Sequence, residues 1–350
     1  MFNVDALVRT NIRTLKPYSS ARDEFKGEAS IFLDANENSL GSPLVKWYNR
    51  YPDPLQLKVK EKIAFIKKIP VDQIFLGNGS DEAIDLLLRC FCEPGIDEVI
   101  IFPPTYGMYE VCANINNIKL NRVPLTEQFQ LDLETLEQAI KPNTKIIWVC
   151  SPNNPTGNSI DREAIELILN NFDGLVVIDE AYINFSRQKS WLSDLQDYPN
   201  LVILQTLSKA WGLAGIRLGM AFASPEIISY FNKVKPPYNI SEPVQELAIK
   251  ALDEIGQVND MIVTLVNERQ NLSNALQQFD EVIKIHPSDA NFLLVEFKQA
   301  KALYQYLVDQ GIVVRDRSNV TLCEGCLRIT VGTPTENQKL LQQIHSFNKQ

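Results

Sequence analysis

Histidine is scarce in this chain, where His286 and His345 are the only two among 350 residues. Mechanisms that depend on a Ser-His pair, a Cys-His pair or a cluster of histidine metal ligands are therefore nearly excluded. Any proton transfer must instead come from lysine, tyrosine, aspartate or glutamate.

Long hydrophobic runs and an excess of positive charge are missing as well. No stretch approaches the roughly 18 apolar residues of a membrane helix. The net charge of -9 argues against a nucleic-acid-binding surface, which needs clustered lysine and arginine. The first residues show no basic segment followed by an apolar stretch, so we expect no secretory signal and a cytoplasmic protein.

The six cysteines do not form the pattern of a disulfide framework. Only Cys323 and Cys326 have the C-x-x-C spacing, and they run directly into the apolar segment 327–331. A zinc site would need a second such pair, and a redox site would need a strand followed by a helix. We therefore expect neither a metal nor a redox function.

Apolar segments alternate with helical patterns along most of the chain. Strands are predicted at residues 31–34, 74–76, 98–102, 145–150, 175–179, 201–205 and 218–222. Near-continuous apolar strands separated by helical segments indicate an α/β protein with a mainly parallel sheet covered on both faces. Amphipathic helices are predicted at about 55–68 and 83–92.

The length of the chain favours two domains. We predict an N-terminal arm at 1–30, a large domain at 31–255 and a small α+β domain at 256–350. The small domain would contain strands at 291–297, 311–315 and 327–331, and residues 31–45 could join it.

A lysine in a loop of small residues and glycines is the centre of the chemical interpretation. Lys209 follows the strand at 201–205, and partial burial can lower the pKa of a lysine there to roughly 7–8. It would then form a Schiff base with a carbonyl. Thr206, Ser208 and Arg217 offer hydroxyls and a cation for a phosphate, which together suggest pyridoxal phosphate. Two alternatives stay open: a solvated surface lysine, and a Ser208 nucleophile activated by Lys209.

Other strand-end residues supply partners for such a cofactor. Asp179 ends a strand, and a carboxylate there could keep a pyridine nitrogen protonated. Tyr182 and Asn154 could hydrogen-bond the ring oxygen. Ser80 is a natural N-cap for the helix at 83–92, whose free amides would form an anion site. Each motif alone has a plain structural explanation, but their order with Lys209 downstream favours the cofactor.

The order of five motifs resembles that of the fold-type-I pyridoxal-phosphate-dependent aminotransferases. These motifs are GNGSDE at 77–82, PTYGMY at 104–109, PNNPTG at 152–157, DEAY at 179–182 and SKAWGLAGIR at 208–217. More narrowly, the chain resembles the histidinol-phosphate aminotransferases through DANEN at 34–38, RYPDP at 50–54, PYNIS at 237–241, ANF at 290–292 and CLRITVGT at 326–333. The resemblance implies a large domain with a seven-stranded sheet.

The resemblance also implies a role for each site residue. Lys209 would bind the cofactor and carry the proton, Tyr106 would stack on the pyridine ring, and Asp179 would pair with its nitrogen. Tyr182 and Asn154 would hold the ring oxygen. The implied phosphate ligands are Gly79, Ser80, Asp81, Thr206, Ser208, Arg217 and, from a second subunit, Tyr51. The implied substrate residues are Arg328 for a carboxylate, Arg315 for a phosphate, Tyr18 from the neighbouring subunit, and Asn36.

The reaction implied by the resemblance is transamination between L-histidinol phosphate and 2-oxoglutarate in a homodimer with shared active sites. A broad-range aromatic aminotransferase and a threonine-phosphate decarboxylase are rivals with the same fold. A Ser-Lys hydrolase would leave Asp179, Tyr182 and Arg217 unexplained. A regulator without catalysis would normally carry an additional DNA-binding domain, for which the chain has no room.

Overall fold

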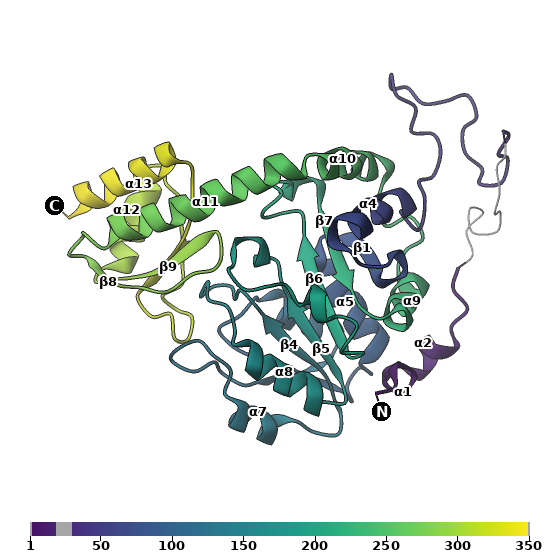
Figure 1. Cartoon of the computed structure of the whole chain (residues 1–350), viewed down its shortest axis with the longest axis horizontal. Coiled ribbons are helices and arrows are strands. Elements are labelled where there is room, and N and C mark those ends of the chain that lie inside the picture. Colours follow the sequence, from purple (N-terminus) through teal and green to yellow (C-terminus); the bar gives the residue numbers. More distant parts are fainter. Residues whose placement is uncertain (1, 19–29, 349–350) are drawn as a thin grey trace.

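The computed structural model describes residues 2–18 and 30–348 and contains two β-sheets, which are joined by a largely helical stretch of the chain (Figure 1). The larger sheet has seven strands in the order β1-β7-β6-β5-β4-β2-β3. Its strands are β1 (Ile74–Asn78), β2 (Glu98–Ile101), β3 (Lys119–Arg122), β4 (Thr144–Cys150), β5 (Leu175–Asp179), β6 (Leu201–Thr206) and β7 (Leu218–Phe222). Only β7 runs against its neighbours, β1 and β6, so the mainly parallel seven-stranded sheet is confirmed.

Helices cover both faces of this sheet, because its strands are apolar on both sides. One buried cluster includes side chains of α5 (Ser80–Phe91), α6 (Met108–Ile115) and α9 (Pro225–Val234). The cluster on the opposite face includes side chains of α4 (Leu57–Lys67), α7 (Leu133–Ala139), α8 (Arg162–Asn171) and α10 (Glu242–Asp253). The helices predicted at about 55–68 and 83–92 correspond to α4 and α5.

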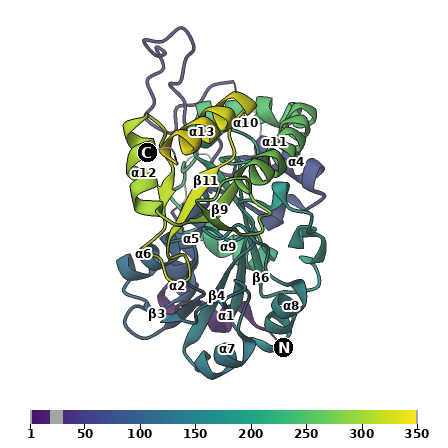
Figure 2. The ribbon, with the colours of Figure 1, turned by 90° about the vertical axis from the view of Figure 1, so that its left-hand side faces the viewer.

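The smaller sheet is antiparallel and has the order β10-β11-β9-β8 (Figure 2). Its strands are β8 (Val282–Ile285), β9 (Phe292–Phe297), β10 (Arg315–Asp316) and β11 (Cys326–Thr330). One face packs on α11 (Ile255–Leu276), α12 (Ala300–Asp309) and α13 (Pro334–Phe347). The other face, through Phe292 and Leu294, joins a core cluster of the larger sheet. The domain boundary near residue 255 stays a prediction.

Short helices complete the described chain. The 3₁₀ helices are η1 (Val71–Gln73), η2 (Ile183–Phe185), η3 (Trp191–Asp194) and η4 (Ala214–Ile216). Near the N-terminus are α1 (Val4–Leu7) and α2 (Thr10–Thr14). Val8, which follows α1, and Ile12 of α2 are buried in the core beside α5. Residues 19–29 of the predicted arm lie outside the described residues.

The strand predicted at 31–34 is wrong. No strand forms there in the described chain, and Ile31 and Leu33 are 72% and 83% exposed. Two strands, β3 and β8, were not predicted. Three of the four side chains of β3 are polar, and β8 has only four residues, none of them fully buried. Each lies at an edge of its sheet, where burial imposes no continuous apolar run.

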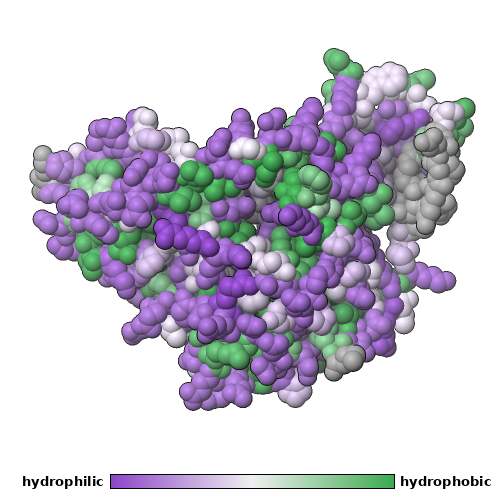
Figure 3. Space-filling model, viewed as in Figure 1, coloured by the Kyte–Doolittle hydropathy of each residue, from purple (hydrophilic) through white to green (hydrophobic). Residues whose placement is uncertain are grey.

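The segment between residue 30 and α4 leaves the body of the molecule at the upper right of Figure 1. This segment carries exposed apolar side chains, and the space-filling view shows hydrophobic residues at its tip (Figure 3). Its most exposed large apolar residues are Ile31, Leu33, Leu40 and Val45, followed by Trp47 and Leu44. None of the helices in the described part of the chain combines the length and apolar character that a membrane crossing requires.

Candidate active site

A cavity of about 630 Å³ lies at the carboxyl ends of the parallel strands, between the two sheets. Loops after β1, β2, β4, β5 and β6 line one side, and the hairpin of β10 and β11 lines the other. Parallel α/β sheets bind ligands at this edge because side chains and amides of several loops converge there. The predicted residues that line it are Gly79, Ser80, Asp81, Tyr106, Asn154, Asp179, Tyr182, Thr206, Ser208, Lys209, Arg217, Arg315 and Arg328.

Lys209 stands in the turn that follows β6, with its amine directed to the cavity. Its Nζ lies 5.6 Å from the centre of the Tyr182 ring. Partial burial lowers the pKa of Lys209, and the positive charge of Arg328 acts in the same direction. A lowered pKa increases the fraction of neutral amine, which is the form that attacks a carbonyl.

Asp179 ends β5 with its carboxylate buried and facing the cavity. Its two oxygens accept separate hydrogen bonds: Oδ2 from the Tyr109 hydroxyl at 2.7 Å, and Oδ1 from the Ala181 N–H at 3.0 Å. Burial raises the pKa of Asp179, while the hydrogen bond from Tyr109 opposes that rise. The two donors therefore favour a carboxylate that can hold a cationic partner.

Tyr182, Asn154 and Arg328 form a connected group on the other side of Lys209. The Asn154 amide donates to the Tyr182 hydroxyl at 3.5 Å, and Arg328 Nη1 donates to Asn154 Oδ1. The guanidinium lies 5.2 Å from the centre of the Phe292 ring. Arg328 Nε is buried without a hydrogen-bond partner among the described residues. This unpaired donor marks a place where a ligand oxygen would fit.

An anion site is present where β1 leads into α5. Gly79 has a φ of +73°, and a Cβ added there would lie 2.6 Å from Arg217 Nη2. The missing side chain thus lets the guanidinium approach the helix N-terminus. Ser208 adds a hydroxyl, which accepts from Thr206 Oγ1 at 3.0 Å. Backbone N–H groups, a cation and hydroxyls together suit a phosphate.

Ser80 does not have the predicted capping role. The N-cap of α5 is Gly79, and Ser80 is the first helical residue. The Asp81 carboxylate accepts from the Tyr106 hydroxyl at 3.0 Å and lies 3.5 Å from Arg217 Nη2. Asp81 could therefore contribute its backbone N–H to an anion, while its side chain orients Tyr106 and Arg217.

Arg317 and Tyr109 were missed by the sequence reasoning. Arg317 lines the cavity beside Arg315 and Arg328. Arg315 and Arg328 are direct cross-strand partners, and the Arg317 N–H bonds to the Cys326 carbonyl at 2.9 Å. Alternate residues of a strand share one face, so the R-D-R sequence at 315–317 could have indicated that Arg317 lies on the same side as Arg315. The partner of Tyr109 is 70 residues away in sequence, so no local pattern could reveal it.

Three predicted site residues do not line the cavity of their own chain. Tyr18 is 75% exposed and borders a separate small pocket beside Pro54 and Lys235. Tyr51 stacks on Tyr238, with ring centres 4.5 Å apart. Asn36 stands in the projecting segment with a φ of +55°. The roles of Tyr18 and Tyr51 involve a second subunit and stay predictions, as does that of Asn36.

The arrangement fits pyridoxal phosphate by the chemistry of its donors. One cavity presents a lysine of lowered pKa, a buried carboxylate for a ring nitrogen, and a tyrosine and an asparagine for a ring oxygen. The anion site at the start of α5 belongs to the same cavity. A Ser-Lys hydrolase would leave the carboxylate and the tyrosine–asparagine pair without a role.

Comparisons with known proteins agree with this geometry. The family model described as aminotransferase class I and II matches residues 45–344. A histidinol-phosphate aminotransferase of Parabacteroides distasonis is 55% identical over 347 residues, covering 99% of each chain. One of Cytophaga hutchinsonii is 51% identical over 346 residues, also covering 99% of each chain.

Solved structures extend the similarity to three dimensions. Histidinol-phosphate aminotransferase from Sinorhizobium meliloti, in complex with pyridoxal-5′-phosphate, has a TM-score of 0.77 and 25% identity, covering 85% of this chain and 83% of that one. L-threonine-O-3-phosphate decarboxylase from Porphyromonas gingivalis has a TM-score of 0.74 and 24% identity, covering 87% and 92%. The second likeness shows the fold alone, so the fold does not separate transamination from decarboxylation.

Proposed function

Because the chain belongs to the aminotransferase class I and II family, and within it to the histidinol-phosphate aminotransferases, we propose its reaction and substrates as follows. The enzyme transfers an amino group between L-histidinol phosphate and 2-oxoglutarate, giving imidazole-acetol phosphate and L-glutamate, in histidine biosynthesis. Its cofactor is pyridoxal phosphate. The observation that carries the proposal is one cavity lined by Lys209 and by two arginines that act on it, Arg217 from the larger sheet's side and Arg328 from β11.

The proposed cofactor site assigns one contact to each side chain. Bound pyridoxal phosphate supplies an aldehyde that takes up the amino group and a ring that accepts electrons. Asp179 holds the proton of the ring nitrogen, and Tyr182 and Asn154 donate to the ring oxygen. Tyr106 stacks on the ring. The phosphate ligands are Gly79, Ser80, Asp81, Thr206, Ser208 and Arg217.

Lys209 is the proposed proton carrier. Its neutral amine would take the proton from Cα of the amino donor and hold it for its return, while the bound cofactor would supply the ring that accepts electrons. The lowered pKa of Lys209 suits this role, since a general base works best when its pKa lies near the operating pH. His286, one of the two histidines, lines a different pocket, and His345 lies on α13.

Arginines explain how one site accepts two kinds of substrate. Glutamate and 2-oxoglutarate carry carboxylates, whereas histidinol phosphate carries a phosphate in place of the α-carboxylate. Planar guanidinium groups bind both anions through paired hydrogen bonds. Arg328 is proposed to bind the α-carboxylate or the phosphate, and Arg315 to add a contact to the phosphate.

A homodimer with shared active sites is the proposed assembly. The exposed apolar side chains of residues 31–57 support it, because a patch of this kind marks an interaction surface. Tyr51 would reach the cofactor phosphate of the second subunit, and Tyr18 its substrate. A cytoplasmic location is also proposed; the six buried cysteines, all unpaired, suit a reducing compartment.

Steady-state kinetics tests the proposed reaction. With histidinol phosphate and 2-oxoglutarate, initial-rate lines at several fixed concentrations of the second substrate are expected to run parallel, because one site serves two half-reactions. Loaded enzyme given histidinol phosphate alone should lose its visible absorption as the amino group moves to the cofactor. Intersecting lines would contradict two half-reactions. Release of carbon dioxide from threonine phosphate, without any response to histidinol phosphate, would favour the decarboxylase.

Arg317 is expected to strengthen binding of the phosphate-bearing donor. Replacing it with glutamine should raise KM for histidinol phosphate about tenfold, since a charge-assisted hydrogen bond contributes roughly 1.5–3 kcal/mol. We expect kcat and KM for glutamate to change little. The control is Lys301→Gln, which removes an exposed positive charge on α12. Lys301 and Arg317 both lower the pKa of Asp316, but Lys301 does not line the cavity. Equal effects of the two substitutions would show only a change in overall charge.

A further inference from the structure

Tyr109 is buried directly behind the cavity and touches the residue proposed to hold the ring nitrogen. Its side chain is 0% exposed, and its hydroxyl donates to Asp179 Oδ2 at 2.7 Å. Tyr109 lies in the first turn of α6, and Asp179 is the last residue of β5. The hydrogen bond between them therefore connects a helix that covers the sheet to the carboxyl edge of the sheet. Tyr109 itself does not line the cavity.

The orientation of the Tyr109 ring is fixed on two sides. It stacks on Trp148 of β4, with ring centres 5.0 Å apart and planes 15° apart. Its edge meets Tyr106, the proposed stacking residue, at 5.6 Å and 85°. The hydroxyl donates to Asp179, and the Cys150 thiol is its second polar neighbour.

Burial makes Asp179 dependent on its donors. A buried carboxyl group tends to take up a proton, because ionisation without water is costly. A protonated Asp179 could not stabilise a proton on a neighbouring pyridine nitrogen. The Tyr109 hydroxyl stays a donor throughout the physiological range, since burial and the Asp179 charge hold its pKa well above the usual value.

We propose that Tyr109 is a positioning residue that keeps Asp179 ionised and directed at the ring nitrogen of the cofactor. The Ala181 N–H holds Oδ1, and Tyr109 holds Oδ2, which leaves the remaining lone pairs for the cavity. Asp179 also faces Lys209, Asp81 and Cys150, but none of these is hydrogen-bonded to its carboxylate among the described residues. The inference rests on the proposed role of Asp179 and is independent of the substrate.

The test replaces Tyr109 with phenylalanine, which removes the hydroxyl and keeps the stacked ring. Enzyme loaded with ¹⁵N-labelled pyridoxal phosphate should show a ring-nitrogen chemical shift displaced towards that of an unprotonated pyridine. The Kd for pyridoxal phosphate should rise about tenfold and kcat should fall about 10- to 100-fold, the range for one hydrogen bond to a charged group. KM for the amino donor should stay within about a factor of three.

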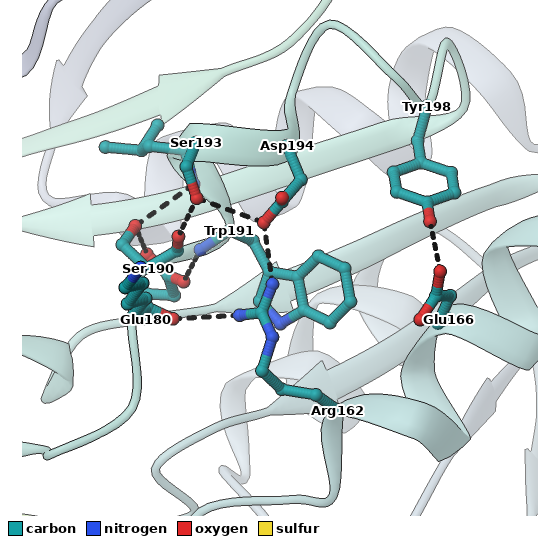
Figure 4. Close-up of polar contacts among 10 residues, drawn as sticks. Arg162, Glu166, Glu180, Ser190, Trp191, Ser193, Asp194 and Tyr198 are labelled. Carbon is teal, nitrogen blue, oxygen red and sulfur yellow. Dashed lines mark hydrogen bonds and ion pairs between the residues drawn. The ribbon is translucent and has the colours of Figure 1, made fainter.

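Tyr198→Phe is the matched control. Tyr198 donates to Glu166 Oε1 at 3.0 Å and meets Trp191 edge to face, so it too is a tyrosine with an aromatic neighbour and a carboxylate partner (Figure 4). Trp191 lies on η3, Glu166 on α8 and Tyr198 in the loop after η3, and none of the three lines the cavity. The control should leave the ¹⁵N shift and the cofactor Kd unchanged.

A second variant separates this inference from the role of Asp179. If Asp179→Asn displaces the ¹⁵N shift and Tyr109→Phe does not, the inference about Tyr109 is wrong. If Asp179→Asn leaves the shift unchanged, the assignment of Asp179 itself is wrong. Tyr109→Phe added to Asp179→Asn should have little further effect on the shift, because Tyr109 acts through Asp179.

A substitution at a fully buried site can also impair folding. Site-specific 3-fluorotyrosine at position 109 keeps the hydroxyl and makes it a stronger donor, so it provides an independent test. It should leave the ring nitrogen protonated and the cofactor Kd no weaker than in the unmodified protein. Loss of the protonated signal in this variant, with an unchanged thermal melting transition, would overturn the proposal.

Discussion

Replacing Lys209 with alanine is expected to lower kcat for histidinol phosphate on the order of 10⁴-fold, the upper range for loss of a positioned acid–base group. The side chain is the only lysine that lines the described cavity. The neighbouring Tyr182 and Tyr106 cannot replace it, because burial raises the pKa of each tyrosine and leaves both as neutral hydroxyls. Lys209 is therefore the proposed acceptor of the Cα proton among the described residues that line the cavity.

Spectra and cofactor binding separate this loss from unfolding. The variant should keep the phosphate ligands at the start of α5, and so should still bind pyridoxal phosphate, but reversibly and without the visible absorption of a lysine-bound cofactor. Lys250→Ala, which changes an exposed lysine of α10, is the control and should retain full activity. Residual activity above about 1% in Lys209→Ala would contradict the assignment, given the 10²- to 10⁴-fold range of such groups.

A charge-conserving variant refines the same prediction. Lys209→Arg retains a cation between Asp179 and Arg328, but a guanidinium does not lose its proton at physiological pH. If the role of Lys209 is proton transfer, this variant should be as inactive as alanine. Substantial activity in the arginine variant would instead indicate that position 209 contributes mainly a positive charge.

The central strands could be predicted from the sequence because burial on both faces imposes an apolar run. Val176, Ile178 and their neighbours in β5 form a short run of apolar residues, which is typical of a strand in a covered parallel sheet. The edge strand β3 has the sequence KLNR and gives no such signal. At 31–34, Ile31 and Leu33 are exposed in a single chain, so their pattern fits an interface better than a strand.

The cavity residues were predictable where they directly follow a strand. Asp179 is the last residue of β5, and Asn154 and Lys209 follow the adjacent strands β4 and β6, so the topology alone brings the three together. Tyr109 belongs to a helix and acts from behind the sheet, where its side chain looks like any core aromatic. Ser80 was misjudged because the glycine before it, and not the serine, takes the cap conformation.

Replacing Arg328 with glutamine is the second large effect that we expect. One guanidinium nitrogen, Nη1, already donates to Asn154, and Nε is buried without a partner among the described residues. Nε and Nη2 therefore offer one edge for a bidentate bond to a carboxylate. Loss of two charge-assisted bonds, each of roughly 1.5–3 kcal/mol, should raise KM for 2-oxoglutarate and glutamate at least about 100-fold.

Arg328→Lys distinguishes the shape of the group from its charge. Lysine keeps the positive charge but loses the planar pair of donors and the contact with Asn154. We expect its KM for 2-oxoglutarate to lie nearer to that of the glutamine variant than to that of the unmodified enzyme. Lys298→Gln, an exposed position after β9 in the same sheet, should leave KM unchanged and is the control for net charge.

Arg328→Gln should not lower thermal stability, although it should lower activity. Burial lowers the pKa of Arg328, and Arg317 and Arg315 act in the same direction, so the charge is unfavourable in the folded protein. Arg315 stands directly opposite it on β10, and like charges in such a pair are destabilising. The melting temperature of the variant without ligand should therefore equal or exceed that of the unmodified protein. A large fall in melting temperature would show that Arg328 supports the fold. An unchanged or higher melting temperature together with a raised KM would show that the repulsion between Arg328 and its neighbouring arginines is retained for binding an anion.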